Sequence, residues 1–462
     1  MIKVTNASRL SGRRLVLAAG GLALAAVGAG WIVATDGWVV GLVILASLVL
    51  VALAFVGPEG MLVLLVCAGP FMVGRMVDLG PGTPDISLER VLLLWAACVL
   101  VVQWLTRRRS LPVLGVEDGL LLAFLAWGLV SIFLWKPGNV AQQLLDFGTY
   151  LLPLVAYLVV KSTANRERAL FALIVPAVPL LLIISLVVPG EWISGMSILG
   201  VDSQPVAGTV RSQSFFRSPW EFGTVAGMLM GLCLFSLGTY VARPLRRLTA
   251  LAIGVGAVAI SLSFMRAAWL GMLTVVGILA WQNRKLRGLV FLGLLVLVLL
   301  GVAYSAVLVQ SHLWTDRIAH TGNVIGRMLL LQQQWSLFLR NPVFGIGLGG
   351  LASTTFEFSR DFATISHNMY MSHLIDFGLL GLTYLAAIFM ILAKSVDTYR
   401  RLPRGKPVGK ELVAALWAAV AVFLIAAATL ETRLFMYVNV LLWVALGLLA
   451  AVRARVVVDR SE

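Results

Sequence analysis

The chain contains few charged residues, few histidines and few cysteines. Only 12% of its 462 residues are Asp, Glu, Lys or Arg, whereas a soluble domain has about 25%. This scarcity of charge excludes an ordinary soluble enzyme and a long disordered protein. The three cysteines all lie within apolar runs, so we expect small core residues and neither a disulfide nor thiol chemistry.

Apolar residues dominate the composition instead. Hydrophobic residues make up 60% of the chain, and its mean hydropathy is +0.96. A membrane-spanning helix needs about 20 consecutive apolar residues, whereas membrane strands are about ten residues long and alternate strictly. Runs such as VLLLWAACVLVVQWL are longer and do not alternate. We therefore predict an all-α, polytopic integral membrane protein.

The apolar runs predict 12 to 14 transmembrane helices, with 14 as the best count because several segments are weak. The segments are 15–35, 37–56, 59–77, 88–105, 118–135, 145–161, 167–188, 219–241, 247–264, 267–282, 287–309, 369–394, 411–429 and 434–452. One long outer loop, 310–367, separates the eleventh and twelfth segments. Its stretch Asn323–Leu339 has helical apolar spacing. We expect this loop to cap the active site as part of one membrane domain, residues 1–462.

Basic residues indicate the topology, because Lys and Arg accumulate on cytoplasmic loops. If the N-terminus is cytoplasmic, most of the 36 Lys and Arg residues lie inside, in seven short groups at 3–14, 107–109, 161–168, 243–247, 284–287, 394–410 and 453–460. This pattern predicts that both termini are cytoplasmic. Because these groups form no continuous basic face, we expect no nucleic-acid partner. We expect the first apolar segment to be retained as a helix rather than removed as a signal peptide.

The basic residues that remain outside are almost all arginine, the side chain suited to bidentate phosphate recognition. They are Arg75, Arg90, Lys136, Arg211, Arg217, Arg266, Arg317, Arg327, Arg340, Arg360 and Arg433. Arg266 lies in SLSFMRAAWLGM with no proper loop around it, where a cation is costly unless it is paired or lines a wet cavity. An ion pair with Glu431 is the alternative for Arg266. For Arg211 and Arg217, which precede a helix, a headgroup or loop contact is the alternative.

One histidine occupies a position suited to general base catalysis. His367 lies in ATISHNMYMSHLIDFGLLGL, where we expect Ser366 to cap a helix that begins with His367 and Asn368. An imidazole on a rigid helix end is a candidate base, because its pKa is near neutral. His373 lies six residues further along, about 240° around a helix. We therefore expect His373 to be structural and to lie outside that site.

Other motifs do not indicate a metal or nucleotide site. The outer acids are scattered, without an Asp-x-Asp or His-x-x-x-His pair, so we predict no metal and no cofactor. NPVFGIGLGG lacks the Lys-Ser/Thr of a phosphate loop and predicts a turn that brings the loop to the membrane face. Arginines and one histidine on the outside are consistent with an outward-facing site that holds a diphosphate while the histidine accepts a hydroxyl proton.

Four segments, in this order, resemble the O-antigen ligase and O-antigen polymerase superfamily. They are VRSQSFFRSPWEFG, SFMRAAWLGM, GNVIGRMLLLQQQWSLFLRNPVFGIGLGG and SHNMYMSHLIDFGLLGL. The family pattern is an arginine ahead of a helix, a Ser-Arg-like turn, a long loop ending in Pro-x-x-Gly-x-Gly, and His-Asn opening the next helix. The resemblance implies a metal-independent, all-helical glycosyltransferase of the bacterial inner membrane, with its active site facing the periplasm.

The resemblance also implies substrates and residue roles. The donor would be glycan linked to undecaprenyl diphosphate, and the acceptor would be lipid A-core or a second lipid-linked glycan. Membrane lipids and a chain-length regulator are further candidate partners. By position, His367 would activate the acceptor hydroxyl, with Asn368 in a supporting role. Arg211 and Arg266 would bind the donor diphosphate.

Two departures from the family pattern concern the arginines. Ser263 is separated from Arg266 by two residues, whereas the family turn is usually Ser-Arg. Arg217 competes with Arg211 for the role of the first arginine. Arg327 lies where the long loop of the family often carries a further arginine, so it is a fourth candidate for the donor diphosphate.

Three alternatives stay open at this point. Ligase and polymerase would use the same site, so the sequence does not separate them. A peptidoglycan glycosyltransferase of the rod-shape and division family would instead depend on an acid of the long loop, Asp316, Glu357 or Asp361. A lipid-linked glycan flippase or transporter would have a similar number of helices, although the chain shows no evident repeated halves.

Overall fold

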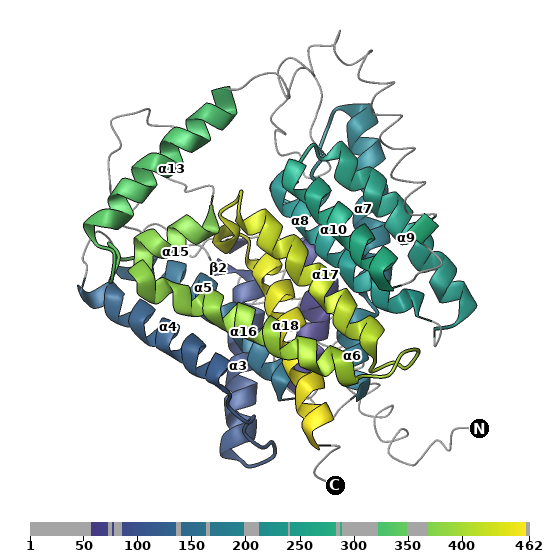
Figure 1. The fold of residues 1–462 in the computed structure, drawn as a ribbon, viewed down its shortest axis with the longest axis horizontal. Helices are drawn as coiled ribbons and strands as arrows, with labels where there is room; N and C mark the ends of the chain where they lie inside the picture. Colours follow the sequence, from purple (N-terminus) through teal and green to yellow (C-terminus); the bar gives the residue numbers. More distant parts are fainter. Residues whose placement is uncertain are drawn as a thin grey trace, which may run out of the picture.

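A computed structural model gives the architecture of the protein (Figure 1). The structure describes residues 57–72, 76–77, 86–134, 140–162, 167–197, 212–238, 241–282, 287–288, 322–348 and 368–458. Two short strands form an antiparallel hairpin, with β1 (Met76–Val77) paired to β2 (Ile86–Ser87). The rest of the regular structure in these ranges is helical.

The helices follow one another with short connections. They are Pro58–Met72, α3 (Leu88–Leu105), α4 (Val116–Leu134), α5 (Val140–Lys161), α6 (Glu167–Ile174), α7 (Ala177–Ser194), α8 (Pro219–Cys233), α9 (Arg243–Leu262), α10 (Arg266–Gln282), α13 (Gly322–Arg340), α15 (Met369–Phe377), α16 (Leu382–Arg401), α17 (Lys410–Ala427) and α18 (Met436–Val458), with short 3-10 turns η1 (Leu234–Leu237), η4 (Gly378–Gly381) and η5 (Thr432–Leu434). Within the described ranges, nine helical segments are long and apolar enough to cross a membrane. The prediction of an all-α, polytopic membrane protein is thereby confirmed.

The number of spans stays a prediction, because segments 15–35 and 37–56 and nearly all of 287–309 lie outside the described residues. Three predicted segments have a different internal structure. Segment 59–77 ends as a helix at Met72 and continues into β1. Segment 167–188 is divided into α6 and α7 at Pro176, which cannot donate a helical hydrogen bond. Segment 369–394 is divided at Gly378, whose φ is +62°.

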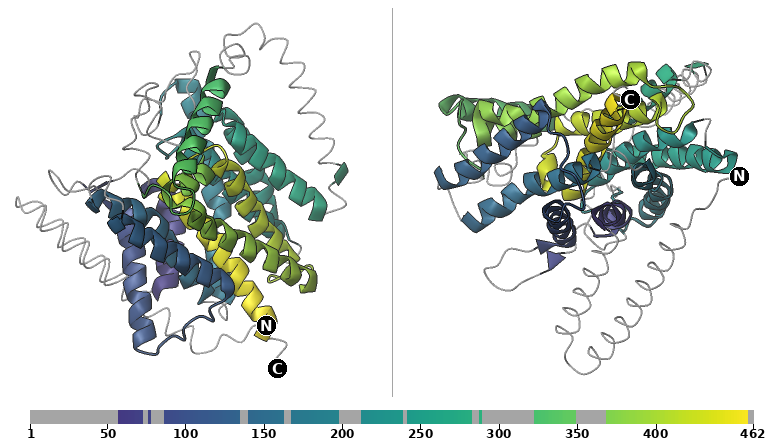
Figure 2. Two further views of the ribbon diagram at one scale, coloured as in Figure 1. Left: turned by 60° about the vertical axis from the view of Figure 1, so that its left-hand side comes forward. Right: turned by 90° about the horizontal axis from the view of Figure 1, so that it is seen from below.

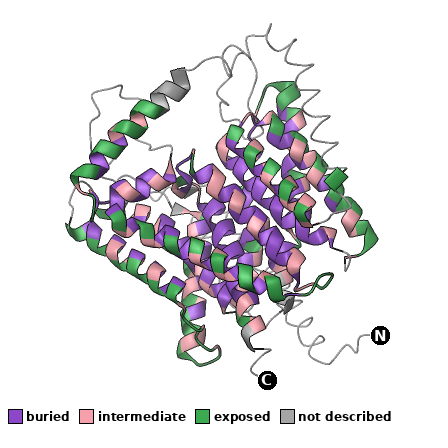
Figure 3. Cartoon of the chain, in the orientation of Figure 1, coloured by how far each residue is buried: buried purple, intermediate pink, exposed green. Residues whose placement is uncertain are grey.

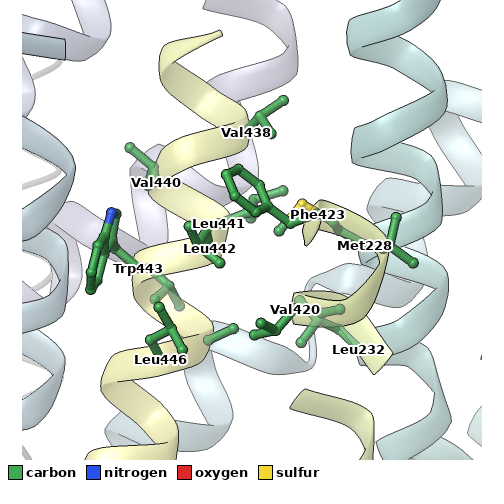
Figure 4. Close-up of a cluster of buried hydrophobic side chains, with 14 of the residues drawn as sticks. Met228, Leu232, Val420, Phe423, Val438, Val440, Leu441, Leu442, Trp443 and Leu446 are labelled. Carbon is green, nitrogen blue, oxygen red and sulfur yellow. The ribbon is translucent and has the colours of Figure 1, made fainter. Parts of the chain in front are cut away.

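Two helices form the centre of the bundle. In the membrane-spanning window of α18, 94% of the residues are buried, and in that of α8 the share is 89%, whereas it is only 28% for α3 and for α9 (Figure 3). Figure 4 shows side chains of α8, α17 and α18 that meet in this core, including Met228, Phe423 and Leu442. Helices that are apolar on all sides are buried, as these are.

Small residues allow the central backbones to approach closely. A Cβ atom added at Gly231 of α8 would lie 2.7 Å from the backbone nitrogen of Ala419 in α17. A Cβ added at Gly447 of α18 would lie 3.0 Å from the carbonyl oxygen of Tyr157 in α5. Close backbone approach at small residues is a common way to pack helices in a membrane, where lipid provides little hydrophobic drive for association.

Four of the predicted basic groups lie at the same end of the bundle, which we call the basic end. Each contributes a side chain to an ion pair there. Lys394 and Arg453 both contact Glu117, Lys161 contacts Asp118, and Arg109 contacts Glu59. The opposite end, which we call the site end, carries α13 (Figures 1 and 2). The alternation of helix directions expected from charge is therefore present in the described part of the chain.

Candidate functional site

Three helices that carry or follow predicted site residues begin at the site end. They are α8, α10 and α15, and α17 joins them. A Cβ added at Gly227 of α8 or Gly271 of α10 would lie 2.8 or 3.1 Å from Val422 of α17. Two residues further along, the carbonyl of Leu424 accepts a hydrogen bond from the hydroxyl of Tyr370, in the first turn of α15 (2.7 Å). The outer part of α17 thus brings these three helices together.

A buried carboxylate fixes the loop that precedes α8. Glu191, near the end of α7, accepts hydrogen bonds from the backbone N–H groups of Gln213 (3.0 Å) and Ser214 (2.9 Å). Ser214 has a left-handed backbone, with φ at +53°, and its hydroxyl donates to the carbonyl of Ile184 (2.7 Å). Ser218 then caps α8 by accepting from the N–H of Glu221 (3.2 Å). This loop begins directly after Arg211, which lies outside the described residues.

Arg217 lies in this loop with an exposed side chain, directly before α8. Its charge acts on two buried carboxylates, those of Glu89 at the start of α3 and Glu221 at the start of α8. A guanidinium whose charge is shared by two acids has less to offer a phosphate ligand. This geometry favours Arg211 over Arg217 as the first donor-binding arginine.

The turn between α9 and α10 accounts for the altered spacing of the Ser-Arg motif. Ser263 is buried, and its hydroxyl donates to the carbonyl of Ile260 (2.7 Å) and accepts from the N–H of Met265 (3.3 Å). Phe264 has a φ of +52° and reverses the chain. Arg266 then begins α10 with an exposed side chain. An anion at this position would meet both the guanidinium and a helix N-terminus.

The start of α15 differs from the prediction in one respect. Asn368, not Ser366, is the N-cap, because its side chain accepts from the N–H groups of Tyr370 (2.9 Å) and Met371 (3.2 Å). The helix therefore begins at Met369, and the prediction that it begins with His367 is wrong. His367 and Ser366 lie outside the described residues. A short side-chain acceptor is needed at the N-cap, and the asparagine supplies it.

His373 is buried in the interior, as expected for a structural residue. Its ring packs among the aromatic rings of Phe124, Tyr150, Phe377 and Tyr384, with centroid distances of 4.9 to 6.2 Å. Its Nδ1 lies 2.8 Å from the carbonyl oxygen of Met369, so a neutral imidazole would donate from this nitrogen.

The glycine motif ties the long outer loop to the far end of α15. The N–H groups of Ile346 and Gly347 donate to the carbonyls of Ile375 (2.8 Å) and Asp376 (3.0 Å). Gly345 has a φ of +75°, and a Cβ added there would lie 2.5 Å from the carbonyl oxygen of Asp376. Only glycine fits this approach. The prediction of a turn that brings the loop to the membrane face is confirmed by these contacts.

The part of the long loop that the structure describes also contains the predicted helix. Phe338 and Leu337 of α13 are buried against α15, in contact with Met371 and Ile375. The expected apolar face is otherwise split, because the apolar side chains of α13 closer to its N-terminus are exposed. They are Met328, Leu329, Leu331 and Trp335. Arg327 lies on α13, but its side chain is outside the described part.

An ion cluster that the sequence analysis did not single out lies beside α15. Arg433, in the connector between α17 and α18, contacts Asp376 of α15 and lies 3.1 Å from Glu431 (Nε to Oε1). Glu431 also accepts from the hydroxyl of Ser372, so its observed partners are these residues rather than Arg266. Burial raises the pKa of Glu431 above its ordinary value, although Arg433 opposes this. Burial disfavours the charge on Arg433, but its two acids outweigh this and raise its pKa.

The comparisons with known proteins agree with the geometry. Residues 250–386 match the O-antigen ligase family. The matched region contains Arg266, the glycine motif and the start of α15, all at the site end. This match confirms the resemblance to the O-antigen ligase and polymerase superfamily and supports a transferase that acts on lipid-linked glycans at a membrane. No curated protein matches the chain.

The O-antigen ligase match does not reach several residues that shape the site end. Glu191, Glu431 and Arg433 lie outside residues 250–386. The signal for them in the sequence was weak: each is a charged residue at the boundary of an apolar segment, and such residues are usually interfacial. Only the fold shows that their partners are irregular backbone and helix starts.

Proposed function

We propose that the protein is a glycosyltransferase that transfers glycan from undecaprenyl diphosphate to an acceptor sugar hydroxyl at the periplasmic face of the bacterial inner membrane. The observation that carries the proposal is the O-antigen ligase match, together with the meeting of its Arg266 turn, glycine motif and α15 start at one end of the bundle. The basic groups at the other end favour the assignment of the site end to the periplasm. Residues 1–462 would act as a single domain.

In the proposed reaction, His367 accepts the proton of the acceptor hydroxyl as its oxygen attacks the anomeric carbon of the donor. The new glycosidic bond forms while the bond from that carbon to the diphosphate oxygen breaks. Undecaprenyl diphosphate leaves, and Arg211 and Arg266 stabilise the negative charge that develops on it. A single displacement inverts the anomeric centre. Two nearby cations favour the neutral imidazole, which is the form that accepts a proton.

A reconstituted transfer reaction tests the proposal and identifies the acceptor. Purified protein in liposomes would receive an undecaprenyl-diphosphate-linked repeat unit as the sole glycan, and the products would be separated on a gel. A ladder of longer lipid-linked chains would identify a polymerase. Product that forms only after addition of lipid A-core would identify a ligase. Absence of product with either acceptor would contradict the proposal and favour a transporter.

A further inference from the structure

The connector between α17 and α18, residues 428–435, contacts one face of α15 at three successive points. The N–H of Met369 donates to the carbonyl of Leu430 (3.1 Å), the hydroxyl of Ser372 donates to Glu431, and Asp376 accepts from Arg433. Positions 369, 372 and 376 are three and four residues apart, so they share one face of the helix. The connector therefore contacts the whole length of α15.

Arg433 joins two of these points. Its side chain is only 14% exposed, and its guanidinium contacts Asp376 with one nitrogen and Glu431 with another. A lysine has one nitrogen on a flexible stem and would not span both carboxylates in the same way. Asp376 also receives the glycine motif through its backbone carbonyl. The Arg433–Asp376 pair thus links the connector, α15 and the long outer loop.

The direction of α15 depends on such contacts. The helix has nine residues, and helices shorter than about 12 residues are marginal without tertiary support. The glycine motif attaches its C-terminal end, and the connector attaches the part that leads to Asn368. The residue directly before this N-cap is His367.

We propose that Arg433 is a positioning residue, which holds α15 through Asp376 and Glu431 and so places His367 for proton transfer. This inference rests on the proposed function, because it takes His367 as the base. Arg433 is not a donor ligand in this account. Its charge is matched by two carboxylates, so the three groups together carry no excess positive charge for a diphosphate.

A kinetic test separates positioning from donor binding. Full-length Arg433→Lys and Glu431→Gln proteins would be reconstituted with the undecaprenyl-diphosphate-linked repeat unit and the acceptor that gives product. We expect kcat to fall about 10- to 100-fold, since a misplacement of about 1 Å at a reacting group costs about 100-fold. The KM for the donor should change less than about twofold, because uniform binding is kept. The double variant should lose little more than the worse single variant, because both act on one contact.

Unchanged kcat in both variants, or a rise in donor KM that matches the loss of rate, would overturn the inference. His367→Ala reports separately on the proposed function, since only that variant removes the base itself. The exposed Arg401–Asp397 pair on α16 provides a matched control, and Asp397→Asn should keep wild-type kinetics.

A second test does not depend on activity. Hydrogen exchange of the α15 amides should rise about tenfold or more in Arg433→Lys, because local opening becomes easier when a tertiary contact is lost. Exchange over the end of α16 should stay unchanged, and Asp397→Asn should leave α15 protected. If α15 exchanges at the wild-type rate in both Arg433→Lys and Glu431→Gln, the positioning role is wrong even where transfer itself is observed.

Discussion

The two ends of the helical bundle both bury charged side chains, but they use them differently. At the basic end, Glu117 and Asp118 open α4 and contact cations at the ends of three other helices, namely Lys394, Arg453 and Lys161. Each of these contacts joins one helix end to another. At the site end, Glu191 instead holds the backbone of a loop, and Arg433 holds a connector against a short helix.

This difference separates stability from function. Charges that join helix ends stabilise the bundle, and their loss should lower the free energy of unfolding without moving a reacting group. Charges that hold irregular backbone fix the position of side chains that substrates would meet, which is what preorganisation of a site requires. Substitutions at the two ends should therefore affect different measured quantities.

The largest predicted contrast lies between two arginines of the site end. Arg266→Ala should lower kcat/KM for the donor by about 100-fold or more, because loss of one group at developing charge costs about 100- to 1,000-fold. Arg217→Ala should cost less than about tenfold, since its charge is already shared with Glu89 and Glu221. Steady-state kinetics in liposomes measures both. Equal losses would remove the distinction that the structure makes between these arginines.

The loop before α8 gives the next contrast. Glu191→Ala leaves two buried N–H groups without their acceptor, which costs about 1–3 kcal/mol for each group. We expect a fall in transfer rate of about tenfold or more, because about 1.4 kcal/mol corresponds to tenfold. Glu191→Gln should recover most of this rate, since its amide oxygen can accept the same bonds. If both variants transfer glycan at the wild-type rate, the loop does not need this carboxylate.

At the basic end the effect should appear in stability. Asp118→Asn breaks a buried pair with Lys161, and removal of one partner of such a pair costs about 3–5 kcal/mol. We expect a lower thermal unfolding midpoint in detergent, with transfer within about twofold of wild type at low temperature. Loss of transfer without loss of thermal stability would show that the two ends are not separated in this way.

The smallest effect is expected for an exposed pair. Asp397 and Arg401 lie one turn apart on α16 with side chains 59% and 38% exposed. Exposed pairs of this spacing contribute about 0.3–0.5 kcal/mol. Asp397→Asn should thus leave both the unfolding midpoint and the transfer rate close to wild type, and a large change in either would indicate a role that the structure does not explain.

Much of the fold was predictable because membrane helices have a strong signal. The apolar runs located α3, α4, α5, α9, α10, α17 and α18 within a few residues, and the positive charges correctly grouped the helix ends. The breaks at Pro176 and Gly378 were missed. Hydropathy alone does not reveal them, because the residues on both sides remain apolar. The break at Gly378 depends on backbone from the glycine motif, which is distant in sequence.

The candidate site was predictable only where a residue type itself implies chemistry. Arg266 at a helix start and Asn368 beside His367 have the local positions that the sequence led us to expect, while their roles stay predictions. The holding residues were not predictable, since the partner of Glu191 is backbone more than 20 residues away. Such pairs are tertiary contacts between irregular segments, for which the sequence has no periodic pattern.

The central claim is that the site end carries a base at the start of α15. The most direct test compares wild type and His367→Ala in the reconstituted reaction, with donor binding and turnover measured on the same protein. The account predicts that the variant binds the undecaprenyl-diphosphate-linked donor with nearly unchanged affinity and makes about 100-fold less product or none, as expected for loss of a general base. A variant that forms product at a near-normal rate would contradict it.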